Sequence, residues 1–141
     1  MAIVFHLNDV LNKFDIRPLA GNIPDLWFDD VTDDSRKCGP GILFVAIERY
    51  RADGHDYLEQ AARLGCRCAL VENGSGPRAP EGMHLVTVQP TRRVFSLLAH
   101  HVEQDPSREM TVFGISGTNG KTTVTWIMES IICAAGKSAG V

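Results

Sequence analysis

The stretch Met110-Thr-Val-Phe-Gly-Ile-Ser-Gly-Thr-Asn-Gly-Lys-Thr-Thr123 joins a short apolar run to a helical pattern through a glycine-containing turn. The apolar residues before the turn are β-formers in a run too short to cross a membrane, which predicts a strand buried on both faces. After the turn, apolar residues recur at three- and four-residue spacing, which predicts a helix that ends at Gly136. A glycine turn between a strand and a helix is typical of phosphate binding.

The turn supplies the groups that phosphate binding needs. Gly117 and Gly120 have no Cβ, so the backbone can turn sharply and approach an anion closely. The free N–H groups at the start of the following helix favour phosphate there. Lys121 can reach the outer phosphates of a nucleotide, and the Thr122 hydroxyl can bind Mg²⁺. The pattern G-x-x-x-x-G-K-S/T is missed by one residue, because Ile115 stands at its first glycine position, so a plain glycine-rich turn remains the alternative.

The composition narrows the class of protein. The 141 residues are 44% hydrophobic and 22% charged, as in a soluble globular protein. Fourteen Lys and Arg stand against 17 Asp and Glu, a net charge of −3, so general affinity for nucleic acid is not expected. The start lacks the basic and long apolar regions of a signal peptide, and the longest apolar run, residues 42–47, is too short to cross a bilayer. We expect a cytoplasmic protein without a membrane partner.

The cysteines and histidines predict no metal centre. Cys66-Arg-Cys68 lacks the second Cys or His pair that would complete a zinc site, so the four cysteines are expected to be buried thiols in a reducing compartment. His100 and His101 are neighbours that face different directions on a predicted helix. All five histidines are expected to be solvated or packed.

Ahead of the glycine turn, predicted helices and strands alternate with short connections, which is typical of a small α/β domain. The predicted helices lie near residues 7–14, 58–62 and 91–102, and the predicted strands at 27–31, 42–47, 68–71 and 85–88. Thr91 is expected to cap the third helix.

Residues 105–109 are polar and contain a proline, which predicts a linker. We therefore expect one domain at residues 1–105 and the start of a second α/β domain at residues 106–141. A parallel strand needs neighbours and cover on both faces, and the second domain has only one strand, its phosphate loop and one helix. The sequence is expected to be the front of a longer protein.

Three segments before this loop carry a family resemblance. Thr32-Asp-Asp-Ser-Arg-Lys37, Pro40-Gly-Ile-Leu-Phe-Val-Ala-Ile47 and Ala52-Asp-Gly-His-Asp-Tyr-Leu-Glu-Gln-Ala61 precede Gly117-Thr-Asn-Gly-Lys-Thr-Thr123. By composition alone, residues 33–36 would more often solvate and cap a turn. In this order, the segments resemble the N-terminal portion of the muramoyl-peptide ligases of the Mur ligase superfamily. The match is best to the members that add the third peptide residue (MurE type), and the ligase that adds D-alanyl-D-alanine is the alternative.

The resemblance implies two binding sites. The UDP end of the precursor would be bound by Asp33, Ser35, Tyr50, Arg51 and Ala52. ATP would be bound by Gly117, Thr118, Asn119, Gly120, Lys121, Thr122 and Thr123, with Lys121 as the catalytic residue and Mg²⁺ on Thr122. Relatives usually have glycine where Arg49 stands, and a bulky residue there could alter the loop that meets the uridine.

The resemblance also implies an activity. The ligases of this family use ATP to activate a substrate carboxylate as an acyl phosphate, which the amine of an amino acid attacks to form an amide. The substrates would be UDP-N-acetylmuramoyl-L-Ala-D-Glu and lysine or diaminopimelate, in peptidoglycan precursor synthesis. The family's further Mg²⁺ ligands, modified lysine and amino-acid-selecting motif lie beyond Val141, so the 141 residues are expected to be inactive alone. A non-catalytic UDP-sugar-binding module is the alternative from another class.

Overall fold

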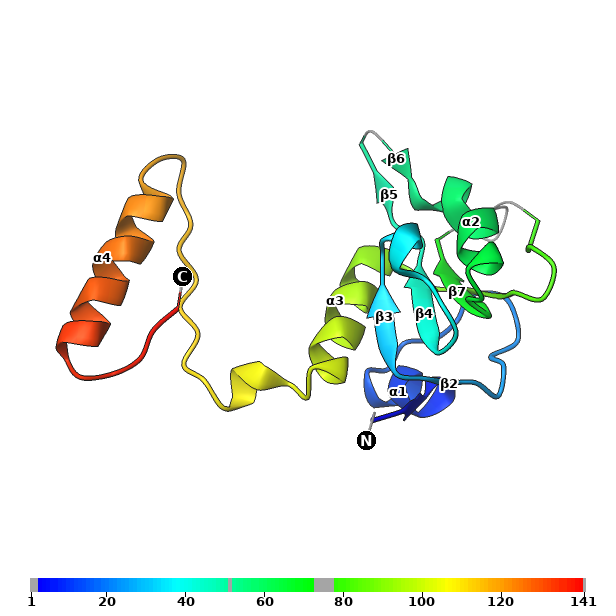
Figure 1. The fold of residues 1–141 in the computed structure, drawn as a ribbon, viewed down its shortest axis with the longest axis horizontal. Coiled ribbons are helices and arrows are strands. Elements are labelled where there is room, and N and C mark those ends of the chain that lie inside the picture. The colour runs from blue at the N-terminus through cyan, green and yellow to red at the C-terminus, as the bar shows by residue number, and fades with distance from the viewer. Residues whose placement is uncertain (1–2, 51, 73–77, 141) are drawn as a thin grey trace. The chain divides into compact units, whose positions relative to one another are not determined.

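The computed structural model describes residues 3–50, 52–72 and 78–140 of the chain. The chain divides into two compact units, Met1–Pro106 and Ser107–Val141 (Figure 1). The division falls within the polar segment that the sequence predicts as a linker. Among the described residues, no helix is long and apolar enough to span a membrane.

A four-stranded parallel sheet forms the centre of the first unit. Its strands are β3 (Asp30–Thr32), β4 (Ile42–Val45), β7 (Cys68–Val71) and β8 (His84–Thr87), in the order β3-β4-β7-β8. Val31 lies opposite Leu43, and Leu70 lies opposite Val86. The parallel sheet with helices confirms the expected α/β class.

Helices cover both faces of this sheet. The helices are α1 (Leu7–Lys13), α2 (Leu58–Arg63) and α3 (Thr91–Val102), as their apolar periodicity predicts. Along β4, Leu43 and Val45 pack in one apolar cluster with α1 and α3, whereas Phe44 packs in another with α2. Successive side chains of a strand point to opposite faces, so the unit has three layers, with α1 and α3 on one side and α2 on the other.

The single strand expected at residues 27–31 is wrong, because the chain changes sheets within it. β2 (Trp27–Phe28) pairs antiparallel with β1 (Phe5–His6), a strand that the sequence does not predict. After Asp29, the chain enters the parallel sheet as β3. The apolar pattern of the segment does not reveal this exchange of partners.

Thr91 also departs from its expected role. Pro90 precedes the first residue of α3, and the Thr91 side chain does not cap the helix. Instead, the Thr91 backbone N–H and hydroxyl donate to Oε2 of Glu72, at 3.3 Å and 2.7 Å. The acceptor for this helix terminus therefore comes from Glu72, directly after β7 and 19 residues away in the sequence.

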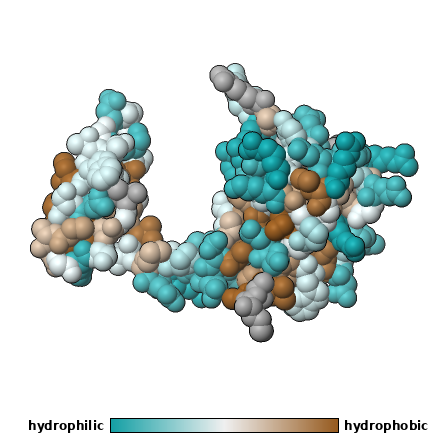
Figure 2. Space-filling model, in the orientation of Figure 1, coloured by the Kyte–Doolittle hydropathy of each residue, from teal (hydrophilic) through white to brown (hydrophobic). Residues whose placement is uncertain are grey.

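The second unit contains the short 3-10 turn η3 (Pro106–Arg108, which begins at the boundary) and helix α4 (Lys121–Ala134). α4 is followed by Gly136 at a φ of +75°, as the predicted helix stop requires. The strand predicted before the glycine turn does not form, and Val112 and Phe113 are 68% and 62% exposed. A strand needs a hydrogen-bonded neighbour, and none of the described residues of this unit supplies one. Apolar side chains accordingly lie at its surface (Figure 2).

Candidate functional site

The turn after β3 is held by its own side chains. The Asp34 carboxylate accepts hydrogen bonds from the Arg36 backbone N–H at 3.1 Å and from its guanidinium at 2.9 Å and 2.8 Å. These bonds, above all those from the guanidinium, lower the pKa of Asp34 to about 2. The Thr32 hydroxyl accepts from the Asp34 N–H at 3.1 Å. Asp34 and Arg36 therefore shape the short 3-10 helix η1 (Ser35–Lys37) that carries Ser35.

Both predicted substrate-binding residues of this turn have protein partners. Ser35 is buried, and its hydroxyl donates to Oε1 of Gln60 on α2 at 2.8 Å. Its oxygen can still accept a hydrogen bond from a ligand. The Asp33 carboxylate accepts from the guanidinium of Arg49. The sequence does not predict either contact, because the partners are far apart along the chain. Ser35 and Gln60 are 25 residues apart, and Asp33 and Arg49 are 16 residues apart.

The remaining predicted substrate-binding residues lie on a small hairpin. β5 (Glu48–Arg49) and β6 (Ala52–Asp53) pair antiparallel, with Arg49 opposite Ala52 (Figure 1). Tyr50 is fully exposed at the tip, and Ala52 is exposed as well. Arg51, the other predicted residue, lies outside the described residues. The Asp33–Arg49 contact brings the hairpin and the turn after β3 together in one region of the first unit.

A buried histidine anchors the base of the hairpin. The short 3-10 helix η2 (Gly54–Tyr57) begins there, and a Cβ on Gly54 would lie 2.6 Å from the backbone nitrogen of Ile47, so only glycine fits. His55 is buried, and its Nε2 accepts from the backbone N–H of Glu72 at 3.2 Å. Nδ1 therefore carries the proton and donates to Asp53. Burial by itself would raise the pKa of Asp53, but the backbone and side-chain hydrogen bonds from His55 outweigh it and the pKa is lowered.

The predicted phosphate loop lies exposed at the start of α4. Gly120 precedes the helix in the left-handed conformation, at φ 75° and ψ 3°, which glycine adopts without strain. The Lys121 ammonium donates to the carbonyl oxygen of Gly117 at 2.6 Å, across the loop. Thr118 and Asn119 lie between these glycines, and all four loop residues are exposed. The first N–H groups of α4 have no acceptor within the helix and remain available to an anion.

The donor set at this helix start suits Mg²⁺ as well as phosphate. Thr122 and Thr123 are exposed in the first turn of α4, beside Lys121. Mg²⁺ prefers oxygen ligands and often binds through one or two protein groups together with substrate phosphates. The Thr122 hydroxyl fits that role. In the part of the chain that the structure describes, no group of three His, Cys, Asp or Glu could hold a metal by itself.

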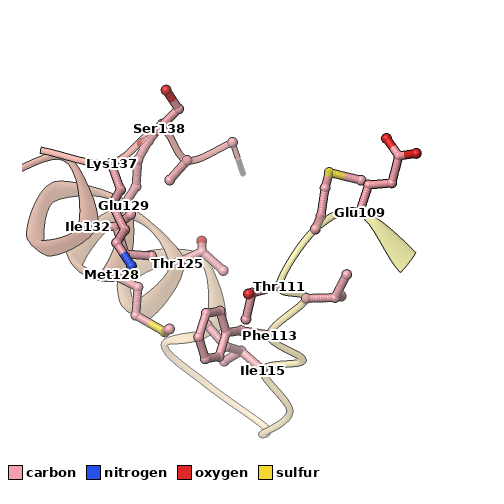
Figure 3. Close-up of a pocket in the computed structure, with 14 residues that line it drawn as sticks. Glu109, Thr111, Phe113, Ile115, Thr125, Met128, Glu129, Ile132, Lys137 and Ser138 are labelled. Carbon is pink, nitrogen blue, oxygen red and sulfur yellow. The ribbon is translucent and has the colours of Figure 1, made fainter. Parts of the chain in front are cut away.

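A separate hollow of about 690 Å³ lies elsewhere in the second unit (Figure 3). Phe113 and Ile115 from the segment before the loop face Met128 and Ile132 of α4 across it. None of residues 117–123 lines this hollow. It is therefore distinct from the predicted phosphate loop.

The prediction that the four cysteines are buried thiols is right for three of them and wrong for the fourth. Cys38, Cys66 and Cys68 are buried there, whereas Cys133 on α4 is exposed and contradicts the prediction. A hydrogen bond from the Cys38 thiol lowers the pKa of Cys66 to about 7, and burial raises the pKa of Cys68 to about 12. Cys133 is exposed like the rest of α4, of which no residue is buried.

The sequence is similar to those of known ligases. It is 33% identical over 126 residues to the UDP-N-acetylmuramoyl-L-alanyl-D-glutamate–2,6-diaminopimelate ligase of Clostridioides difficile, covering 89% of this chain and 25% of that protein. It is 34% identical over 122 residues to the UDP-N-acetylmuramoyl-L-alanyl-D-glutamate–L-lysine ligase of Staphylococcus epidermidis, covering 86% of this chain and 24% of that protein. The chain therefore spans about a quarter of the length of these curated relatives.

Solved structures show the same fold. A crystal structure of MurF from Acinetobacter baumannii matches 94% of this chain and 28% of that chain, with a TM-score of 0.67 and 22% identity. MurF ligase from Thermotoga maritima, in complex with ADP, matches 74% of this chain and 23% of that chain, with a TM-score of 0.52 and 20% identity. The sequence profile described as Mur ligase family, catalytic domain, matches residues 29–102, which is more than half of the chain. The chain belongs to the Mur ligase family.

Proposed function

We propose that this chain works in an ATP-dependent ligase that adds the third residue to UDP-N-acetylmuramoyl-L-alanyl-D-glutamate. The observation that carries the proposal is the similarity, at 33–34% identity over most of the chain, to ligases named for this substrate. One of these relatives is named for 2,6-diaminopimelate and the other for L-lysine, so either amino acid is a candidate. The D-Ala-D-Ala-adding ligase is the second candidate, because the similar solved structures are of MurF.

In this proposal, residues 1–105 bind the UDP end of the precursor. Asp33 and Ser35 follow β3, and the exposed hairpin carries Tyr50, Arg51 and Ala52. The carboxyl ends of parallel strands are the usual ligand-binding edge of an α/β sheet. Ser35 offers its oxygen as an acceptor while Gln60 holds its proton.

Residues 106–141 begin the ATP-binding domain in this proposal. The N–H groups at the start of α4 and the loop formed by Gly117, Thr118, Asn119 and Gly120 would surround the phosphates. Lys121 would exchange the Gly117 carbonyl oxygen for a phosphate oxygen, which is a better partner because it carries charge. Thr123 would donate to an inner phosphate. Mg²⁺, when bound with ATP on Thr122, would neutralise charge on the outer phosphates.

Binding of the precursor tests the first site. UDP-N-acetylmuramoyl-L-Ala-D-Glu should shift the amide resonances of Ser35 and of residues 50–52 in this chain. Ser35→Ala should weaken binding by about 1–3 kcal/mol, because a hydrogen bond is lost at a buried position. Ser96→Ala is the matched control, since Ser96 is exposed on α3 and its hydroxyl donates to the Arg92 carbonyl oxygen of the same helix. Binding that leaves both segments unshifted would contradict the assignment.

Turnover tests the second site. The 141-residue chain alone should form no amide with ATP, Mg²⁺, precursor and amino acid, because the phosphate loop supplies only one side of a phosphoryl-transfer site. In a full-length ligase that carries this sequence, Lys121→Ala should lower turnover by about 10²–10³-fold and leave precursor binding intact. Lys137→Ala removes the same charge outside the loop and should have little effect. Precursor binding without turnover in the full-length protein would favour the non-catalytic UDP-sugar-binding module.

A further inference from the structure

We infer that Arg49 is a positioning residue, which holds the β5–β6 hairpin against the turn after β3 through its ion pair with Asp33. The inference rests on the proposed function, because these two segments carry the residues proposed to bind the nucleotide-sugar. It assigns Asp33 a different role from the one that the family resemblance implies. Asp33 would act through Arg49 and not by contact with the ligand.

The hairpin needs anchors outside its own backbone. Each of its strands has two residues, and they pair only with each other, apart from the parallel sheet. An isolated two-stranded hairpin is at best marginally stable in water. The orientation of its tip is therefore set by contacts with the rest of the first unit.

The base of the hairpin is held by several contacts, and Arg49 makes a contact nearer the tip. The backbone N–H of Gly54 donates to the Ile47 carbonyl oxygen at 3.1 Å, and His55 joins Asp53 to the start of the segment after β7. A guanidinium N–H of Arg92 lies 3.5 Å from the Glu48 carbonyl oxygen. These contacts all hold the ends of the hairpin that join the domain. Arg49 lies one step nearer the tip, directly before Tyr50 and opposite Ala52.

The ion pair joins two separate parts of the proposed site. Asp33 lies between β3 and Ser35, so the pair links the Ser35 turn to the strand that leads into residues 50–52. The Asp33 side chain is 21% exposed and the Arg49 side chain 58% exposed, which makes this a surface pair of modest strength. The pair uses one carboxylate oxygen of Asp33, Oδ2, and so gives Asp33 a role in the site that needs no contact with the ligand.

Binding of UDP to the 141-residue chain tests this inference. Arg49→Ala and Asp33→Asn should each weaken UDP binding about two- to fivefold in calorimetry, the range expected for a surface ion pair. The double variant should bind no worse than Arg49→Ala, because both substitutions remove the same ion pair. Amide exchange of Arg49, Tyr50 and Ala52 should become faster in each variant. Arg63→Ala, which removes an exposed arginine from α2, is the matched control and should change neither quantity.

A charge reversal separates positioning from direct contact with the ligand. The swap of Arg49→Asp with Asp33→Arg restores the ion pair but removes the positive charge from the hairpin. If Arg49 positions the hairpin, the swap restores UDP affinity and slow exchange. A different result would overturn the inference: Arg49→Ala weakens UDP binding, Asp33→Asn does not, and the swap fails to restore the affinity. Arg49 would then contact the ligand directly. Unchanged binding in all variants would overturn it as well. Lack of UDP binding by the unsubstituted chain would instead overturn the proposed function on which the inference rests.

Discussion

The two units contain similar sequence patterns in different surroundings. α3 in the first unit and α4 in the second have 12 and 14 residues, and both carry apolar side chains at helical spacing. Leu98 of α3 is fully buried against the parallel sheet, whereas Ile131 of α4 is 62% exposed. The difference teaches that helical periodicity identifies the helix, but the packed state depends on whether a sheet lies beside it.

The apolar runs of the two units show the same contrast. Residues 42–45 form β4 because β3 and β7 lie on either side of it. Residues 112–115 have a comparable apolar content and form no strand. Backbone groups of a strand need partners from other segments, so an apolar run by itself does not determine whether a strand forms.

Hydrogen exchange is the measurement with the largest expected difference between the units. Amides of β7 should exchange at least about 10³-fold more slowly than those of residues 112–115, because they open only when the domain core opens. The control is the exposed loop around Gly117, whose amides should exchange as fast as those of residues 112–115. Strong protection of residues 112–115 in a monomer would break the comparison, since it would mean that the second unit has a complete core.

Paired truncations should give a smaller difference of the same kind. Leu70→Ala empties a fully buried position of the parallel sheet and should reduce the free energy of unfolding by about 2–5 kcal/mol. Ile131→Ala removes a similar volume from an exposed position and should change it by less than about 0.5 kcal/mol. Urea titrations followed by circular dichroism measure both values. An equal loss from Ile131→Ala would show that α4 is packed in solution.

The smallest expected effect concerns a local ion pair in the first unit. The pKa of Asp34 is lowered to about 2 by Arg36, so the pair stabilises the folded state above the unfolded value of 3.8 and this contribution is lost as the pH falls through about 2. A carboxyl-carbon NMR titration should show this midpoint, and Arg36→Ala should return it towards 3.8. A midpoint near 3.8 in the unsubstituted chain would show that the turn is less ordered than the sheet it follows.

The sequence predicts much of the fold because many of its signals are local. The helix at residues 7–13, the core strand at residues 42–45 and the helix after Gly120 all follow from spacing within one segment. The exchange of sheets at Asp29 and the role of Thr91 are missed, because each depends on a partner far away in the sequence. The candidate site divides in the same way, since the glycine loop is a local pattern and the contacts of Ser35 and Asp33 are not.

The sequence by itself determines the glycine turn before α4, because glycine adopts the left-handed conformation seen at Gly120 without strain and Lys121 begins the helix that follows. It also determines the alternation of helices and strands, since apolar spacing sets which face of each element avoids water. The tertiary structure alone decides that Arg49 meets Asp33 and that Gln60 holds the Ser35 hydroxyl. Such pairings depend on where separate segments lie once the sheet has formed, because charged and polar side chains find partners by distance in space and not by distance along the chain.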